Sequence, residues 1–92
     1  MEIKILKKEG NLVEFELPGE DHSLPNLIVK LALKRPEVDY AAYNIPHPLV
    51  GSPRIVVRVK EGKPLDVVRS IIEEIISLSK EFREKVEEAL KE

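Results

Sequence analysis

Two stretches of this sequence decide its fold: Gly19-Glu20-Asp21-His22-Ser23-Leu24-Pro25-Asn26-Leu27 and Tyr43-Asn44-Ile45-Pro46-His47-Pro48-Leu49. In the first, the Ser23 hydroxyl can accept a hydrogen bond from an amide of a following helix, and Glu20 and Asp21 suit the positive end of the helix dipole. Pro25 is tolerated there because first-turn amides have no helical acceptor. The sequence therefore predicts a helix that begins at Ser23 and is held in one orientation beside a rigid corner, Pro46-His47-Pro48.

The first helix should be short and amphipathic. Its apolar residues recur at i, i+3, i+4 and i+7, the spacing that places side chains on one helix face. They are Leu24, Leu27, Ile28 and Leu31. Pro36 ends the helix, because proline disfavours helical geometry in the residue before it. We expect this helix to span residues 23–33, about three turns.

The second helix should extend well beyond its own sheet. It runs from about Pro64 to Leu90. At about 1.5 Å per residue it would be about 40 Å long, whereas a strand of about seven residues spans only ~23 Å. Its first half is apolar over roughly 180°, wider than the ~100° stripe that one core surface needs. The residues are Leu65, Val67, Val68, Ile71, Ile72, Ile75, Ile76 and Leu78, followed by a narrower stripe of Phe82, Val86, Ala89 and Leu90.

This wide apolar surface predicts a partner polypeptide. Left in water it would form a large exposed apolar patch, which soluble monomers rarely tolerate. We expect a helix of the partner to cover it, with Ile72 and Ile76 facing outward from the chain's own core. The alternative is that the wide stripe lies in a deep groove of the chain's own fold. The sequence leaves both arrangements open.

Four strands complete the expected α+β fold. Apolar and polar residues alternate from Ile3 to Ile5 and from Val13 to Leu17, which is the period of half-buried strands. Gly10-Asn11 lies between these two segments as a hairpin turn. Residues 38–45 and 54–60 are the other two strands. We expect residues 1–92 to form a single domain, since no linker, repeat or low-complexity tract divides them.

Composition excludes several classes of function. The chain has 15 Lys plus Arg against 17 Asp plus Glu, a formal net charge of −2, which disfavours direct binding to DNA or RNA. It has no cysteine, so disulfides and thiolate chemistry are excluded. No secretion signal follows Met1, and no apolar run approaches the ~20 residues of a membrane-spanning helix. We expect a soluble, cytoplasmic protein with no cofactor and no small-molecule substrate.

The candidate catalytic and metal-binding residues are better explained by structural roles. The two histidines, His22 and His47, do not supply the three or four ligands that zinc requires. Asp21, His22 and Ser23 have the composition of a catalytic triad. As chain neighbours on one turn, however, they cannot easily point at one another in the required order. We expect Tyr40 and Tyr43 to be packing residues and not platforms for base stacking.

The paired motifs resemble one known family. The run from Gly19 to Ile28, the later Tyr43-x-x-Pro46-His47-Pro48-Leu49 and the charged helix after Lys63-Pro64-Leu65 look like subunit L of archaeal RNA polymerase. That subunit is the counterpart of the small alpha-like subunit of the eukaryotic nuclear polymerases, and the resemblance covers essentially the whole chain. The family's helix start usually reads His-Thr-Leu-Gly-Asn. Here Ser23 replaces the threonine, and Pro25, which has no amide donor, stands where glycine is expected.

The resemblance implies a ββαββα domain in which a four-stranded, largely antiparallel sheet carries both helices on one face. It also implies a heterodimer with the alpha-like polymerase subunit called D, on which the large catalytic subunits assemble and through which the small subunits N and P attach. Polymerisation would then belong to the large subunits, and this chain would be architectural. The residues expected to contact the partner are Glu20, His22, Ser23, Leu24, Asn26, Leu27, Ile28, Leu31, Pro46, His47, Pro48, Val68, Ile72, Ile75, Ile76, Ser79, Phe82 and Val86.

Two other hypotheses come from different classes of function. The chain could be a homodimeric adaptor that uses the same helices and has no role in a polymerase. It could also be a small enzyme that works around His22 or His47. Replacing either histidine would abolish turnover in such an enzyme while leaving assembly intact, whereas the hypothesis of a polymerase component predicts loss of complex formation.

Overall fold

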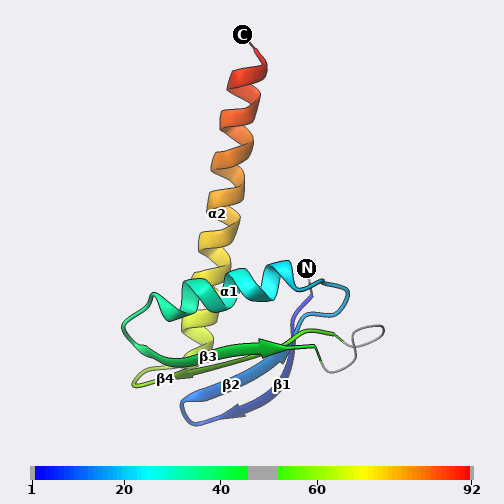
Figure 1. The fold of residues 1–92 in the computed structure, drawn as a ribbon. Coiled ribbons are helices and arrows are strands. Elements are labelled where there is room, and N and C mark those ends of the chain that lie inside the picture. Colours follow the sequence, from blue (N-terminus) through cyan, green and yellow to red (C-terminus); the bar gives the residue numbers. More distant parts are fainter. Residues whose placement is uncertain (1, 46–51, 92) are drawn as a thin grey trace.

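The computed structural model describes residues 2–45 and 52–91 of the chain. They form, in order, β1 (Lys4–Glu9), β2 (Leu12–Glu16), α1 (Ser23–Leu33), β3 (Val38–Asn44), β4 (Arg54–Val59) and α2 (Pro64–Leu90). The strands make one antiparallel sheet with the order β1-β2-β4-β3. Both helices lie on the same face of this sheet (Figure 1). The expected α+β class and the ββαββα order are confirmed.

The hairpin between β1 and β2 is closed by Gly10 and Asn11, as predicted. Gly10 has a φ of 53°, which glycine adopts without the steric cost that a β-carbon brings. The side-chain amide of Asn11 donates a hydrogen bond of 2.8 Å to the carbonyl of Val59, and the Val59 amide donates one of 2.9 Å to the carbonyl of Asn11. These two bonds fix the start of β2 beside the end of β4.

The core lies between the sheet and the two helices. Inward-facing residues of β2 and β4 supply the floor, in the period-two pattern expected from the sequence. The buried apolar residues are Val13, Phe15, Leu17, Ile28, Ala32, Val38, Ile55, Val57, Val59, Val67, Val68 and Ile71. Burying a side chain such as Phe15 contributes about 1.5–3 kcal/mol relative to leaving it exposed.

Two residues expected at the partner surface belong to this core instead. Ile28 is 0% exposed and Val68 is 4% exposed. Ile28 lies four residues before Ala32 and three after Pro25, and all three are buried, so this face of α1 packs inward. Val68 is buried in the same way, beside Val67 and one turn before Ile71 on the first half of α2. Ile28 is not available to a partner in this conformation, and Val68 exposes only a small part of its side chain at the surface.

The start of α1 differs in detail from the expectation. The helix begins at Ser23, but its N-cap is His22, which has helical φ and ψ and makes no side-chain capping bond. Ser23 therefore lies inside the first turn, where its hydroxyl is not placed to cap. The carboxylate of Asp21 accepts a hydrogen bond of 2.8 Å from the Ser23 amide instead. Pro25 is fully buried and contributes to the core.

Helix α2 continues far past the sheet, as predicted. Its first half crosses β4 and β2, and every described residue from Ile76 to Lys91 is exposed. Figure 1 shows the second half rising away from the sheet. Ile72, expected to face outward, does so only in part, because it is half-buried against the core and also lines a surface groove. Ile76, which is 60% exposed, does face solvent.

Candidate functional site

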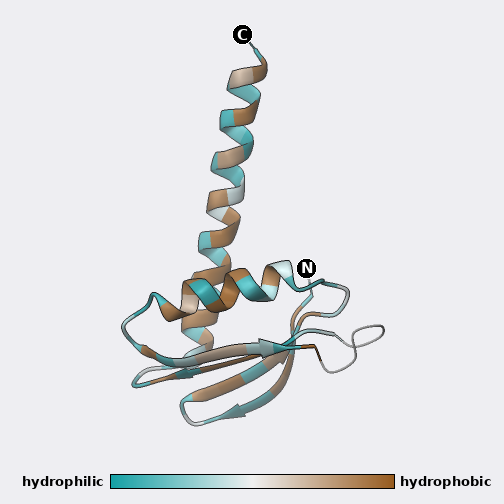
Figure 2. Ribbon diagram, in the orientation of Figure 1, coloured by the Kyte–Doolittle hydropathy of each residue, from teal (hydrophilic) through white to brown (hydrophobic). Residues whose placement is uncertain are grey.

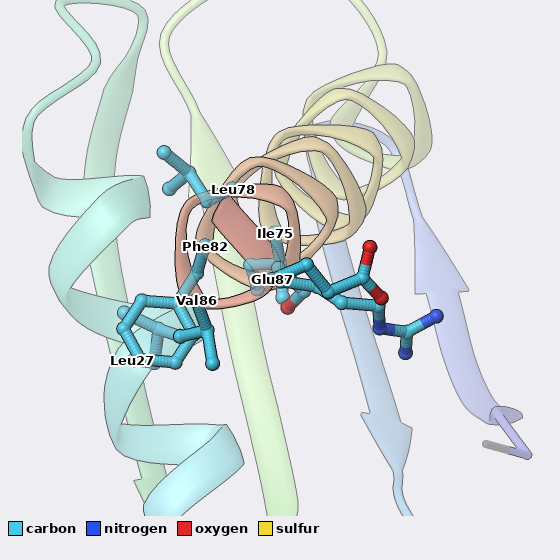
Figure 3. Close-up of a pocket in the computed structure, with 8 residues that line it drawn as sticks. Leu27, Ile75, Leu78, Phe82, Val86 and Glu87 are labelled. Carbon is cyan, nitrogen blue, oxygen red and sulfur yellow. The ribbon is translucent and has the colours of Figure 1, made fainter. Parts of the chain in front are cut away.

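A groove runs along α2 on the side that faces α1. It has a volume of about 630 Å³. We call it the α1/α2 groove and define it by Leu27 of α1 and by Ile75, Leu78, Ser79, Phe82, Arg83, Val86 and Glu87 of α2. Figure 3 views α2 nearly end-on, with the side chains of Leu27, Phe82 and Val86 on the same side of the helix.

The groove continues the face of α2 that packs against the sheet. Val68 and Val86 are eighteen residues apart, which is about five turns at 3.6 residues per turn, so both point in the same direction from the helix axis. Val68 meets the chain's own core, whereas Val86 lies beyond the sheet and is 40% exposed. In the first half of α2 this apolar stripe packs against the chain's own core. In the second half, no described part of the chain covers it.

The opposite side of the overhanging half is charged. A hollow there is lined only by polar residues, Glu81, Glu84, Lys85, Glu87, Glu88 and Lys91. Lys85 and Glu81 form an ion pair of 3.5 Å at the i, i+4 spacing. Brown and teal alternate along this half in Figure 2, as expected for an amphipathic helix. An amphipathic helix that leaves its own sheet leaves its apolar stripe exposed, as a binding surface would be.

An ion pair fixes the two walls of the groove relative to each other. Arg35, just after α1, donates a hydrogen bond of 3.1 Å from Nη2 to Oε2 of Glu74 on α2. Glu74 lies next to Ile75, where the groove begins. The Arg35 Nε is buried and has no hydrogen-bond partner among the described residues. The contact holds the end of α1 against α2 at the point where α2 starts to leave the core.

Only some of the residues that the sequence predicts at the partner surface lie together in the structure. Leu27, Ile75, Ser79, Phe82 and Val86 line the groove together. Ile76 is exposed beside it on α2. The other described nominees are not part of the groove. Leu24, Leu31 and Ile72 are half-buried against the core, and Glu20, His22, Ser23 and Asn26 lie at the start of α1.

The predicted corner cannot be placed. Pro46, His47 and Pro48 lie outside the described residues.

Sequence reasoning missed three residues of the groove. Leu78, Arg83 and Glu87 line it and were not nominated as contacts. Leu78 lies three residues after Ile75 and four before Phe82, so the helical period could have found it. Arg83 and Glu87 form a charged rim, which an apolar pattern does not reveal.

We also searched the described residues for metal sites, membrane-spanning helices and exposed aromatic side chains. Across residues 2–45 and 52–91, no three His, Asp or Glu side chains gather in a way that could hold a metal ion. No helix in that part of the chain is long and apolar enough to cross a membrane. Tyr43 packs against the core as expected. Tyr40 is exposed instead, with the Arg58 guanidinium 5.5 Å from its ring centroid.

Comparison with known proteins identifies the family. Residues 12–85 match the family model of the RNA polymerase Rpb3/Rpb11 dimerisation domain. The chain belongs to this family. It is 42% identical over 87 residues to DNA-directed RNA polymerase subunit Rpo11 of Methanocaldococcus jannaschii, with 85% of this chain and 88% of the relative covered. With the subunit Rpo11 of Pyrococcus furiosus it shares 39% identity over 94 residues, which covers 99% of each chain.

A solved structure of the family agrees in fold. The crystal structure of DNA-directed RNA polymerase subunit L from Thermoplasma acidophilum superimposes with a TM-score of 0.85 at 29% identity, over 98% of this chain and 89% of that one. The resemblance to subunit L seen in the sequence is thereby confirmed. The matched segment of the Rpb3/Rpb11 dimerisation domain includes Leu27, Ile75 and Phe82 of the groove, and it excludes β1.

Proposed function

We propose that this chain is a non-catalytic subunit of a DNA-directed RNA polymerase and that it pairs with the alpha-like D-type subunit. The observation that carries the proposal is the α1/α2 groove. Its apolar stripe lies on a half-helix that contributes nothing to the chain's own core. Membership of a dimerisation-domain family, with relatives named as polymerase subunits, supports the identity of the assembly.

The geometry favours a helical occupant. Residues 77–90 of α2 extend about 20 Å beyond the core at 1.5 Å per residue. Packed helix axes lie about 8–10 Å apart, so a helix of the partner could lie along this length and contact both Phe82 and Leu27. Binding hot spots cluster near the centre of such a contact, in well-packed pockets, and Phe82 would occupy that position. The charged rim formed by Arg83 and Glu87 would set the register of the two helices.

The chain's role in the polymerase would be architectural. The pair formed with the D-type subunit would be the platform on which the large catalytic subunits assemble, with the small subunits N and P attached through the D-type chain. Nucleotide addition would take place in the large subunits. A formal net charge of −2 favours protein contacts over direct contacts with nucleic acid. The chain would work in the cytoplasm, with its polymerase.

Co-expression with a D-type subunit tests the proposal. We expect a 1:1 complex in size-exclusion chromatography and in native mass spectrometry, and this complex should persist at nanomolar to micromolar concentration. Adding the large subunits should then yield an assembly that contains both chains. A stable homodimer that ignores the D-type chain would instead establish the adaptor hypothesis. A folded monomer that binds neither that chain nor itself would leave the groove without a partner and would refute both.

A further inference from the structure

A second apolar groove lies between the first turns of α2 and β1. Its volume is about 300 Å³, and we call it the β1/α2 groove. In Figure 3, α2 separates α1 from the violet strand β1. The residues of α2 that line the second groove come before Ile75, where the α1/α2 groove begins, so the two grooves follow each other along the helix. The residues that line the second groove are Ile3, Ile5, Leu65, Val68, Arg69, Ile72 and Glu73.

The groove exists because α2 does not reach β1. The backbone of α2 approaches β4 and β2 closely and stays further from β1. Ile5 pairs with Phe15 across the β1–β2 ladder, so its side chain lies on the face that carries the core. Phe15 is fully buried there, but Ile5 remains 45% exposed. On the helix face of β1, Ile5 is therefore apolar and only partly covered, and beyond the register shift between Ile5 and Lys7 the same face carries Lys8, which pairs with Val13.

Strand β1 is also an edge of the sheet. It pairs with β2 on one side, and all six of its residues are exposed. An edge strand presents backbone amides and carbonyls that another strand can pair with. An open strand edge beside an apolar groove is the arrangement that proteins use to bind an extended peptide by strand addition.

The positive charges of β1 favour an acidic partner segment. Lys4 pairs with Glu16 and Lys7 with Glu14 in the ladder, so both lysines lie on the face away from the helices. The Lys7–Glu9 ion pair of 3.7 Å is exposed and contributes little. The Lys4–Glu16 pair of 3.8 Å joins an exposed lysine to a half-buried glutamate. With Lys4, Lys7 and Lys8 against Glu9, β1 is net positive, so a second copy of β1 would add like charge along the shared edge, which is unfavourable. An acidic strand would meet these lysines favourably.

We propose that the β1/α2 groove binds an extended segment of another polypeptide in which apolar and acidic residues alternate. The segment adds to the open edge of β1. Its apolar side chains enter the groove beside Ile5 and Ile72, and its acidic side chains lie on the other face beside Lys4 and Lys7. The β1/α2 groove shares no residue with the α1/α2 groove, so substitutions at Ile5 and at Phe82 test the two proposals separately.

A titration with synthetic peptides tests the proposal. The probe is Glu-Val-Glu-Ile-Glu-Val-Glu, added to the isotope-labelled full chain and followed by NMR. We expect saturable binding with a dissociation constant below about 1 mM. The amides of residues 3–9 and of Ile72 should shift, and the β1 amides should gain protection from hydrogen exchange. Two control peptides, one with lysine in place of glutamate and one with serine in place of the apolar residues, should bind at least about tenfold more weakly.

Matched variants locate the site. Ile5→Ser should weaken binding of the acidic peptide at least about tenfold, while retaining a dispersed spectrum. Leu33→Ser removes an exposed apolar side chain elsewhere, at the end of α1, and should leave binding unchanged. Four results would overturn the proposal. They are equal binding of the lysine peptide, shifts centred on Phe82, no binding at about 1 mM, and self-association that Ile5→Ser abolishes, which would make the occupant a second copy.

Discussion

Phe82 and Val68 lie on nearly the same side of α2, yet Phe82 is 70% exposed and Val68 is buried. The difference comes from where the sheet ends and not from the residues themselves. We expect Phe82→Ser to change the chain's unfolding free energy by no more than about 0.5 kcal/mol. The same change should weaken pairing with the D-type chain by at least about 2 kcal/mol, measured by isothermal titration calorimetry.

Glu84→Ser is the matched control for this prediction. Glu84 lies on the charged side of the same half-helix and is equally remote from the core. The variant should pair with the D-type chain as the parent does. Equal losses from the two substitutions would mean that the overhanging half as a whole, and not its apolar stripe, makes the contact.

Ile72 and Ile76 are one turn apart on α2 but differ in burial. Ile72 packs against the core, so Ile72→Asp should lower the chain's own stability by at least about 2 kcal/mol in urea unfolding, because it half-buries an unpaired charge. Ile76 is 60% exposed, so Ile76→Asp should leave that stability nearly unchanged and weaken pairing with the D-type chain. If Ile76→Asp pairs normally, the contact does not extend from the groove to this neighbouring residue.

At the scale of elements, the start of α1 depends on the charge of Asp21. The hydrogen bond from the Ser23 backbone amide, with further contributions from its hydroxyl and from nearby His22, lowers the pKa of Asp21. A lowered folded-state pKa means that the charged carboxylate stabilises the fold. That contribution is fully present above the unfolded value of about 3.9 and is lost as the pH falls through the lower folded-state pKa.

Asp21→Asn tests this contribution, because asparagine keeps an acceptor oxygen and removes only the charge. The variant should be less stable than the parent in urea unfolding at pH 7. The difference should shrink as the pH falls below about 4. A difference that stays constant down to the lowest pH at which the chain folds would show that the charge is irrelevant to this cap.

Only the first half of α2 packs against the core of the chain. A chain that ends at Lys80 would lose the overhang and no buried residue. We expect its thermal midpoint to fall by less than about 4–8 °C, the shift that corresponds to about 1 kcal/mol in a domain of this size. It should fail to co-purify with the D-type chain. A large loss of stability would mean that the overhang supports the core.

The sequence predicted these elements better than it predicted their orientation. Period-two residues such as Phe15 marked the core, and Pro36 and Pro64 marked helix boundaries that the structure confirms. Ile28 and Val68 were misplaced because a wide apolar arc does not tell which side of a helix faces the sheet. That choice depends on how α2 crosses β4 and β2, which is a property of long-range packing. Tyr40 is exposed for a different reason, because it pairs with Arg58 on the sheet face away from the helices.

At the scale of the whole molecule, the chain is elongated, with principal extents of 51 × 34 × 17 Å. Much of its exposed apolar surface lies along α2, at Ile76, Leu78, Phe82, Val86 and Leu90. The free chain should therefore bind the dye ANS, whose fluorescence rises on apolar protein surface. The signal should drop when the D-type chain is added in equal amount. Fluorescence that this addition does not change would place the dye, and the exposed surface, away from the pairing site.

The overhang of α2 also bears on how such a chain can diverge. Under the proposed pairing, substitutions at residues 81–91 affect the contact with the D-type chain and not the core, because each of these residues is exposed. The exposed end of α2 could change in sequence together with the surface that it contacts, while the buried core changes independently. Exchanging residues 81–91 between orthologues should therefore transfer the partner preference and leave the fold of the recipient chain unchanged.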